Sequence, residues 1–551
     1  MMSLWLLLSP LFALVGGGLL VMLVDSFVKE KAEVATATFV VFVVGAGCAA
    51  GLWVSGATAE APDFVSAYLA TDSMALFFDS VICAGGAFTA LLAGGYLREH
   101  GLERGEFYVV LIFTTFGAMV LARAVDLLSI FIGLETMSLG AYALVAFRRT
   151  SPRAAEGAVK YFLLGSFAAA ILLFGSALLY GGTGTTSLAG IGAAIAGGEA
   201  ELTLVILGML LVLVGLGFKV SAVPFHQWTP DAYEGAVTPA TTFMSVAVKS
   251  AAFAVLVRVL VISFSDELSA SAATGWPPVV AGLAAVTMIY GNFAAIAQTS
   301  VKRMLAYSSI AHAGYILVGV AAAVRVEQVA LSAVFYYLLA YTVSNALAFG
   351  ALILMGSKGK EAVSYEDLAG VGRRHPFAAL AFIIGVLTLM GFPPTAGFFA
   401  KYYVFSAAVE AGGGMVWLAV LGVLTSAVGA YYYLKVIVYM FMKEPQPGAP
   451  HAVPMKSGYV AFALVIACLS VFWMGIVPSR YVEMAVQAAS QLRDQDLDGV
   501  TDEADSCANT PRGVEVGPDG CETSEETAQQ APPAEATAAP SEAAGPAPRG
   551  V

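Results

Sequence analysis

Ionisable side chains occur inside long apolar stretches of this 551-residue chain. Four lysines, Lys219, Lys249, Lys401 and Lys435, and one carboxylate, Glu135, lie in segments that are otherwise apolar. A charge at the centre of a bilayer costs roughly 3 kcal/mol or more, so such residues usually face a protein interior and take part in function. Burial favours the neutral form of a lysine, and a nearby carboxylate favours its charged form. The pattern therefore predicts a proton relay.

Two histidines and an arginine are further candidates in or beside the apolar spans. His226 follows Pro224 in PFHQWTPDAYEG, and His312 lies within an apolar span in SSIAHAGY. Because histidine titrates near neutral pH, we predict that His312 joins the relay; the alternative is a structural histidine. Arg258 lies two turns from the end of its span, and we expect its guanidinium to reach the membrane surface. The four lysines could also reach the membrane surface in this way. This explanation is weaker for four lysines and a glutamate together.

The composition indicates what kind of protein positions these residues. Hydrophobic residues make up 59% of the chain and charged residues 12%, with a mean hydropathy of +0.80. A soluble domain has about twice this charged fraction. A cytosolic enzyme, a nucleic-acid binder and a disordered scaffold are therefore excluded. Apolar runs predict an all-α polytopic membrane protein with about fourteen transmembrane helices: 4–24, 34–55, 73–96, 107–123, 126–147, 159–181, 202–222, 240–264, 278–297, 304–324, 329–355, 376–405, 415–441 and 457–477.

The loops differ in their content of basic residues. Odd-numbered loops hold 16 Lys and Arg residues, whereas even-numbered loops hold two, Arg123 and Arg325. Since loops rich in Lys and Arg stay in the cytoplasm, the odd loops are predicted to be cytoplasmic and both termini periplasmic. The expected location is a bacterial inner membrane. Most of the net charge of −12 belongs to the tail that follows Ser479, so it indicates nothing about a substrate of the membrane body.

Two predicted spans combine a helix break with a lysine. Pro224 follows Lys219 by five residues in the seventh span, and Pro393 and Pro394 precede Lys401 in the twelfth. Proline interrupts helical hydrogen bonding. A further lysine lies in the helix after each break. Spans 4–8 and 9–13 therefore look like two five-helix units, and an odd number of helices per unit predicts an inverted repeat with broken helices 7 and 12.

Four separated strings carry a family resemblance: GLETMSLGAYALVAF, FKVSAVPFHQWTPDAYEGAVTPATTF, QTSVKRMLAYSSIAHAGY and GFPPTAGFFAKYYVF. They occur in order over roughly residues 1–480. This region resembles the antiporter-like membrane subunits of respiratory complex I, the NADH–quinone oxidoreductase, and is most similar to its N subunits. The resemblance implies a proton-translocating translocase subunit without a redox centre. Two alternatives stay open, a subunit of a multisubunit cation/proton antiporter and a non-conducting membrane scaffold.

The resemblance also implies roles for residues, cofactors and partners. Glu135 and Lys219 form the coupled pair of one half-channel, Lys249 is the connecting lysine, and Lys401 is the terminal lysine of the other half-channel. His312 and Lys435 are further members. NADH, FMN, iron–sulfur clusters and quinone belong to sister subunits, and this subunit has no cofactor in its membrane body. The partners are the other membrane-arm subunits of complex I and the lipid bilayer, with no nucleic acid.

The tail has a separate pattern. Cys507 and Cys521 are candidates for a disulfide in an oxidising compartment. The string DQDLDGVTDEADSCANTPRGVEVGPDGC resembles a thrombospondin type-3-like calcium repeat, and an acidic linker is the alternative. Carboxylates are suitable calcium ligands, here Asp494, Asp496, Asp498, Asp502 and Asp505. We therefore expect a membrane domain over 1–480, a linker over 481–493, a calcium-binding segment over 494–521 and a disordered Ala/Pro/Glu-rich tail over 522–551.

Overall fold

The computed structural model of the chain describes residues 4–28, 31–55, 62–266, 269–271, 275–356, 361–445 and 453–490, together with residues 492, 507 and 521. The chain divides into two units, Met1–Leu492 and Arg493–Val551. In the second unit a disulfide joins Cys507 and Cys521, the pair expected from the sequence. The predicted calcium ligands lie outside the described residues: Asp494, Asp496, Asp498, Asp502 and Asp505.

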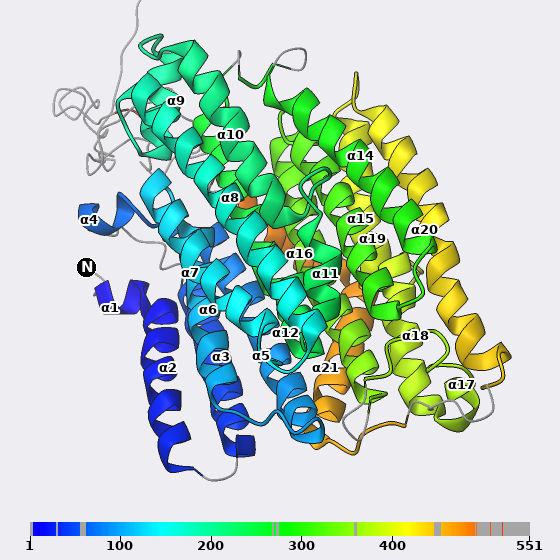
Figure 1. Cartoon of the computed structure of the whole chain (residues 1–551). Helices are drawn as coiled ribbons and strands as arrows, with labels where there is room; N and C mark the ends of the chain where they lie inside the picture. Colours follow the sequence, from blue (N-terminus) through cyan, green and yellow to red (C-terminus); the bar gives the residue numbers. More distant parts are fainter. Residues whose placement is uncertain are drawn as a thin grey trace, which may run out of the picture. The chain divides into compact units, whose positions relative to one another are not determined.

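Thirteen helices in the described part of the first unit are long and apolar enough to cross a membrane. A further crossing is divided into two shorter helices, α18 (Pro376–Met390) and α19 (Ala396–Glu410). Together they account for the fourteen predicted spans (Figure 1). The long helices are α2 (Ser9–Phe27), α3 (Lys31–Val54), α5 (Ser73–Glu99), α6 (Glu106–Arg123), α7 (Leu127–Val145), α8 (Pro152–Thr183), α10 (Leu202–Val220), the continuous segment Thr238–Ser263, α14 (Trp276–Ile296), α15 (Val301–Ala322), α16 (Glu327–Leu354), α20 (Val416–Met442) and α21 (Gly458–Ile476).

Short elements connect these spans. The segment Thr238–Ser263 consists of α12 (Thr238–Phe243), a π-helical turn η1 (Met244–Val248) and α13 (Lys249–Ser263). The described residues contain no β-strand, only three isolated bridges. The all-α prediction is thus confirmed. The remaining helices are α1 (Leu4–Leu7), α4 (Asp63–Ser66), α9 (Leu188–Ala196), α11 (Trp228–Gly235), α17 (Val371–Arg374) and α22 (Pro478–Ser490).

The two predicted helix breaks are present. After α10, Ser221 adopts a left-handed conformation with φ +66°, and the chain continues into α11. After α18, Gly391 has φ +89°, and α19 begins five residues later, beyond Pro393 and Pro394. Glycine adopts this conformation without steric cost, and neither proline has an N–H with which to continue a helix. The fourth span of each five-helix unit is therefore interrupted, as the sequence predicted.

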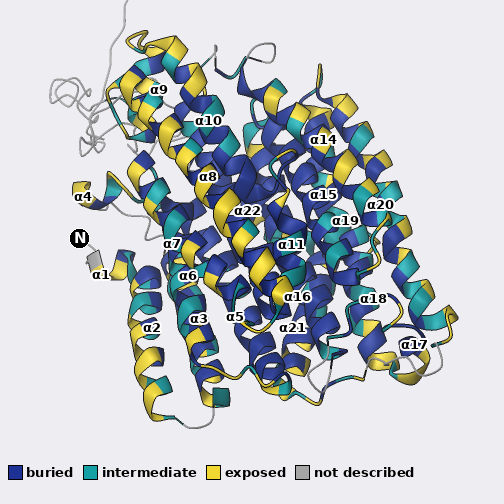
Figure 2. Cartoon of the chain, viewed as in Figure 1, coloured by how far each residue is buried: buried dark blue, intermediate teal, exposed yellow. Residues whose placement is uncertain are grey.

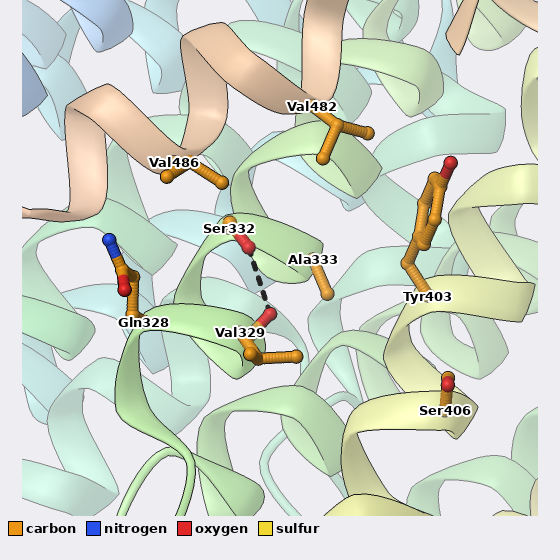
Figure 3. Close-up of a pocket in the computed structure, with 8 residues that line it drawn as sticks. All are labelled: Gln328, Val329, Ser332, Ala333, Tyr403, Ser406, Val482 and Val486. Carbon is orange, nitrogen blue, oxygen red and sulfur yellow. Dashed lines mark hydrogen bonds between the residues drawn. The ribbon is translucent and has the colours of Figure 1, made fainter. Parts of the chain in front are cut away.

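The interior of the first unit is formed by a subset of the helices. The helices α5, α15 and α16 and the segment Thr238–Ser263 are buried over most of their length, whereas α2, α3, α8, α20 and α21 expose much of theirs (Figure 2). The exposed residues of these outer helices are largely apolar, as a surface in contact with lipid requires. Lys249 lies on one of these buried segments, and Lys401 faces another, α15.

The expected linker over 481–493 needs correction, because a helix covers most of it. Helix α22 runs from Pro478 to Ser490 and packs on α16 and α5. Ala485, Ala488 and Ala489 are buried in that contact, and Trp53 Nε1 donates a hydrogen bond to the Gln487 side chain over 2.9 Å. Three alanines spaced three and four residues apart make a narrow apolar stripe that composition alone does not reveal. The first unit accordingly ends at Leu492.

Candidate proton-relay site

The first pair of predicted residues, Lys219 and Glu135, lies at the end of α10 beside α7 and α8. Lys219 is buried one residue before α10 ends, and its Nζ lies over the rings of Tyr142 and Tyr161 at 5.4 and 5.1 Å. Glu135 projects from α7 and attracts the lysine electrostatically. The two side chains have no nitrogen–oxygen contact within 4.0 Å. Within the described residues, Lys219 Nζ and Glu135 Oε1 make no hydrogen bond. Neither charge is committed to a fixed ion pair.

The centre of the first unit holds Lys249 and His312. Lys249 begins α13 directly after the π-helical turn, and its Nζ donates to the Ser309 carbonyl oxygen over 2.7 Å and to Ser309 Oγ over 2.6 Å. π-Helical turns occur frequently at functional sites. His312 lies one turn farther along α15 than Ser309. His312 interacts electrostatically with both Lys249 and Lys401.

The second half of the site is formed at the break between α18 and α19. Lys401 on α19 donates from Nζ to the carbonyl oxygen of Met390 over 2.9 Å and to Ser426 Oγ over 2.7 Å. The ring of Tyr315 lies under the same ammonium at 5.0 Å. Met390 is the last residue of α18, whose terminal carbonyls have no partner within the helix. The helix break thus supplies the acceptor that holds this lysine.

A small cavity separates His312 from the broken helix. Its volume is about 10 Å³, close to the space that one water molecule requires. Tyr337 and Tyr341 line it on the side of α16, while Thr388 of α18 and Ala400 of α19 line it on the other side. Ala400 immediately precedes Lys401 in the chain. His312 and the second broken helix therefore line the same small cavity.

Lys435 is not brought into this buried group. It is partly exposed on α20, and its Nζ lies 4.6 Å from the ring centroid of Tyr365 in the loop that follows α16. Lys249 and Lys435 each lie in the fifth span of their five-helix unit. Only Lys249 points into the interior. His226 is buried beside the ring of Tyr290 at 4.5 Å, away from the lysines of the group.

Two buried ion pairs were missed by the sequence-based prediction. Arg258 does not reach the membrane surface, since it is 1% exposed and binds both carboxylate oxygens of Asp72 over 2.7 and 2.6 Å. Arg123, which was counted as a loop residue, is fully buried against Asp79. Both arginines are needed to neutralise carboxylates at membrane depth. Asp79 was the available signal, because it is an aspartate inside a predicted span.

Lys302 is also more buried than its predicted loop position suggested. Its Nζ donates to the Ala236 carbonyl oxygen over 2.6 Å and lies 3.6 Å from Glu361 Oε2. Glu361 accepts hydrogen bonds of 2.6 Å from Tyr96 and Thr238. Burial alone would raise the pKa of the Glu361 carboxyl. The nearby ammonium and the two hydroxyl donors outweigh burial and hold this pKa below its usual range.

A second polar cluster surrounds α11, next to the first helix break. Asp231 accepts from Lys160 over 2.7 Å and from Arg303 over 2.6 Å, and Arg303 also reaches Glu234 at 2.9 Å. Burial would raise the pKa of Asp231, but its hydrogen bonds to the two cations outweigh this effect and lower that pKa. The cluster joins α8, α11 and α15, and so it ties the first repeat to the second.

Known proteins resemble this chain in sequence and in fold. Residues 124–429 match the family model described as NADH:quinone oxidoreductase/Mrp antiporter, TM. The chain is 56% identical over 500 residues to NADH-quinone oxidoreductase subunit N 1 of Sorangium cellulosum, covering 88% of this chain and 98% of that relative. The chain belongs to the N subunits of NADH-quinone oxidoreductase. Other N subunits are similar over most of their length, including that of Trichlorobacter lovleyi, 42% identical over 86% of this chain and 94% of the relative.

Chains of solved structures have the same fold. A chain in a structure of respiratory complex I from Thermus thermophilus with bound aureothin is 34% identical, with a TM-score of 0.71, covering 87% of this chain and 99% of that one. A chain of the Mrp complex from Dietzia sp. DQ12-45-1b has a TM-score of 0.76 at 23% identity, covering 89% and 97%. At that identity the second likeness shows the fold alone.

Proposed function

We propose that this N subunit translocates protons in the membrane arm of complex I. The observation that carries the proposal is the burial of three lysines, Lys219, Lys249 and Lys401, on three different helices of the membrane body. His312 interacts electrostatically with two of these lysines. Lysine suits a relay because its neutral form is accessible, unlike that of arginine. The geometry supports a path that passes from one repeat to the other through the centre.

The proposed order of groups follows the described contacts. Glu135 stabilises the charged form of Lys219 at the first break. Lys249 is the connecting group, and His312 lies between it and Lys401. Lys435, which lies apart over Tyr365, is a peripheral member whose removal has the smallest expected effect.

The energy for this transport comes from elsewhere in the complex. Relatives bear the name NADH-quinone oxidoreductase subunit N, and no group of three or more His, Cys, Asp or Glu residues that could hold a metal occurs in the described part of this chain. We propose that NADH, FMN, iron–sulfur clusters and quinone are bound by sister subunits. The partners of this subunit are then the neighbouring membrane-arm subunits and the bilayer of a bacterial inner membrane.

The direct test replaces each buried lysine by alanine in the assembled complex. Lys219→Ala, Lys249→Ala and Lys401→Ala should each reduce NADH-driven proton uptake into proteoliposomes and, through coupling, quinone reduction. Lys456→Ala is the matched control, because Lys456 is exposed in the described structure. Wild-type proton uptake and quinone reduction in all three buried variants, with the complex fully assembled, would contradict the proposal.

The second candidate is a subunit of a cation/proton antiporter. The matched family model includes Mrp antiporters, and a chain of an Mrp complex has the same fold. The two functions predict different partner subunits and a different requirement for sodium. Purification with NADH-oxidising subunits and sodium-independent proton uptake support the complex I function. Purification with other antiporter subunits and sodium-dependent proton exchange support the alternative.

We further propose that both termini are periplasmic. We also propose that the tail, which follows the membrane domain in the chain, binds calcium. The Cys507–Cys521 disulfide suits an oxidising compartment, and basic residues concentrate in the odd-numbered loops, as the positive-inside rule requires of cytoplasmic loops. Calcium content per N subunit, measured in complexes with the full chain and with a chain ending at Leu492, tests the calcium site. Equal content would identify residues 494–521 as an acidic linker. Modification of a cysteine added at the C-terminus by an impermeant reagent tests the topology.

A further inference from the structure

Helix α20 contacts both Lys401 and His312 along one face. Ser426 Oγ accepts the hydrogen bond from Lys401 Nζ over 2.7 Å. Seven residues later on the same helix, the Tyr433 hydroxyl lies 3.2 Å from His312 Nε2. Seven residues are close to two helical turns, about 10.5 Å, so both side chains project from the same side of α20. One rigid element therefore holds partners of two relay groups.

The imidazole of His312 is held from two sides. Its Nδ1 lies 2.7 Å from the hydroxyl of Tyr337 on α16, and its Nε2 faces Tyr433 on α20. A neutral imidazole has one N–H donor and one acceptor nitrogen, whereas a tyrosine hydroxyl can serve either role. The two tyrosines can therefore bind His312 in either tautomer and in its charged form. They fix where the ring lies without fixing its protonation state.

The Tyr433 hydroxyl has a further partner on α15. It forms a hydrogen bond with Ser308 Oγ, and Ser308 precedes Ser309, which accepts from Lys249. A hydroxyl carries a single proton, so Tyr433 can donate to only one of His312 and Ser308 at a time. Both Tyr433 and Ser308 are buried, which removes solvent as a competing partner. The orientation of this one hydroxyl thus depends on the protonation state of His312.

We infer that Tyr433 is a positioning residue of the relay, which holds His312 Nε2 between Lys249 and Lys401 and links it through α20 to the Ser426 contact of Lys401. This inference rests on the proposed proton-translocating function. Tyr433 touches no substrate and changes no charge. Its removal takes away the hydroxyl partner of Nε2, so His312 spends less time in the position from which it serves both lysines.

The test compares two tyrosines of α20. Tyr433→Phe removes one oxygen and keeps the buried ring, and it should lower NADH-driven proton uptake about three- to tenfold, the range that the loss of one hydrogen bond produces. Tyr431→Phe is the matched control, since Tyr431 is exposed on the same helix. The amount of complex recovered with its NADH-oxidising subunits checks assembly. Wild-type proton uptake by assembled Tyr433→Phe would overturn the inference.

A double-mutant cycle separates positioning from a structural role. If Tyr433 acts through His312, Tyr433→Phe should have little further effect in a His312→Ala background. An equal loss in both backgrounds would mean that Tyr433 supports the helix packing, and the inference would fail. Where His312→Ala leaves too little uptake to measure, Tyr337→Phe replaces it, and the double variant should lose more than the product of the single losses. A loss equal to that product overturns the inference.

The same preparations distinguish this inference from the proposed function. If Lys219→Ala, Lys249→Ala and Lys401→Ala all pump normally, the proton-translocating function itself is wrong. If Lys401→Ala abolishes proton uptake while Tyr433→Phe is unchanged, the function stands and only the role of Tyr433 is wrong.

Discussion

Lys401 and Met390 are joined by a hydrogen bond of 2.9 Å, from the ammonium to the carbonyl oxygen at which α18 ends. The break in the helix therefore creates the acceptor for the lysine that follows it. Lys219 has no equivalent, because it precedes its own break and faces aromatic rings instead. The two broken helices place similar lysines in different surroundings, with one held by oxygen atoms and the other free to respond to Glu135.

Replacing Lys401 by arginine should be nearly as harmful as replacing it by alanine. Arginine keeps the positive charge but does not release its proton in the working pH range, so a relay through this position stops. We expect Lys401→Arg to lower proton uptake at least about tenfold if release of this proton is required. The measurement is NADH-driven proton uptake by assembled complex in proteoliposomes. If arginine supports normal uptake and alanine does not, Lys401 acts as a fixed charge.

Glu135 should be needed for its charge. Because the carboxylate favours the charged form of Lys219 and makes no ion pair within 4.0 Å among the residues that the structure describes, Glu135→Gln should slow proton uptake, whereas Glu135→Asp should be milder. The rates of all three forms are compared at equal amounts of assembled complex. Equal uptake by the glutamine variant and the wild type would show that the relay does not use this charge.

The Arg123–Asp79 pair should affect stability more than transport. Removing one partner of a fully buried ion pair leaves an uncompensated charge, which costs about 3–5 kcal/mol, whereas removing both costs much less. Arg123→Leu should therefore lower the thermal unfolding temperature of the purified complex, and Arg123→Leu/Asp79→Leu should recover most of the loss. A double variant that is less stable than Arg123→Leu would show that the pair itself holds α5 against α6.

The Asp231 cluster predicts a pH dependence for α11. The pKa of Asp231 is lowered from 3.8, so its ionised form stabilises the folded state at higher pH, and this contribution is lost as the pH falls through the lowered value. At pH 7, Asp231→Asn should increase hydrogen exchange of α11 in the purified complex. On acidification below 3.8 the wild type should approach the variant. Exchange rates that already agree at pH 7 would exclude a stabilising role for Asp231.

Much of the fold could be predicted because its strongest physical constraint is visible in the sequence. A membrane span needs about 20 apolar residues, and each of the fourteen predicted runs corresponds to a helix or a broken helix in the structure. The breaks were visible as Pro224 and as Pro393 and Pro394 beside buried lysines. Helix α22 was not predicted, because its 13 residues are too few to span a membrane, although Val482, Ala485, Val486 and Ala489 recur along it at helical spacing.

The candidate site could be predicted as a set of charged residues and not as a set of contacts. Lys219, Lys249 and Lys401 stand out because a charge is rare in an apolar run. Ser309 and Tyr433 do not, because hydroxyl groups are common in membrane helices and only the packing of distant spans shows which of them face a lysine or His312. The string SSIAH, which places two serines within four residues of His312, was the available signal on α15.

The packing of α22 bears on how a C-terminal module can be gained or lost in evolution. A recombination point near residue 480 would remove the alanine stripe and expose the apolar surfaces that it covers on α16 and α5. A point just beyond Leu492 leaves every helix of the first unit intact. A module joined beyond that point therefore leaves the alanine stripe, and the surfaces that it covers on α16 and α5, unchanged.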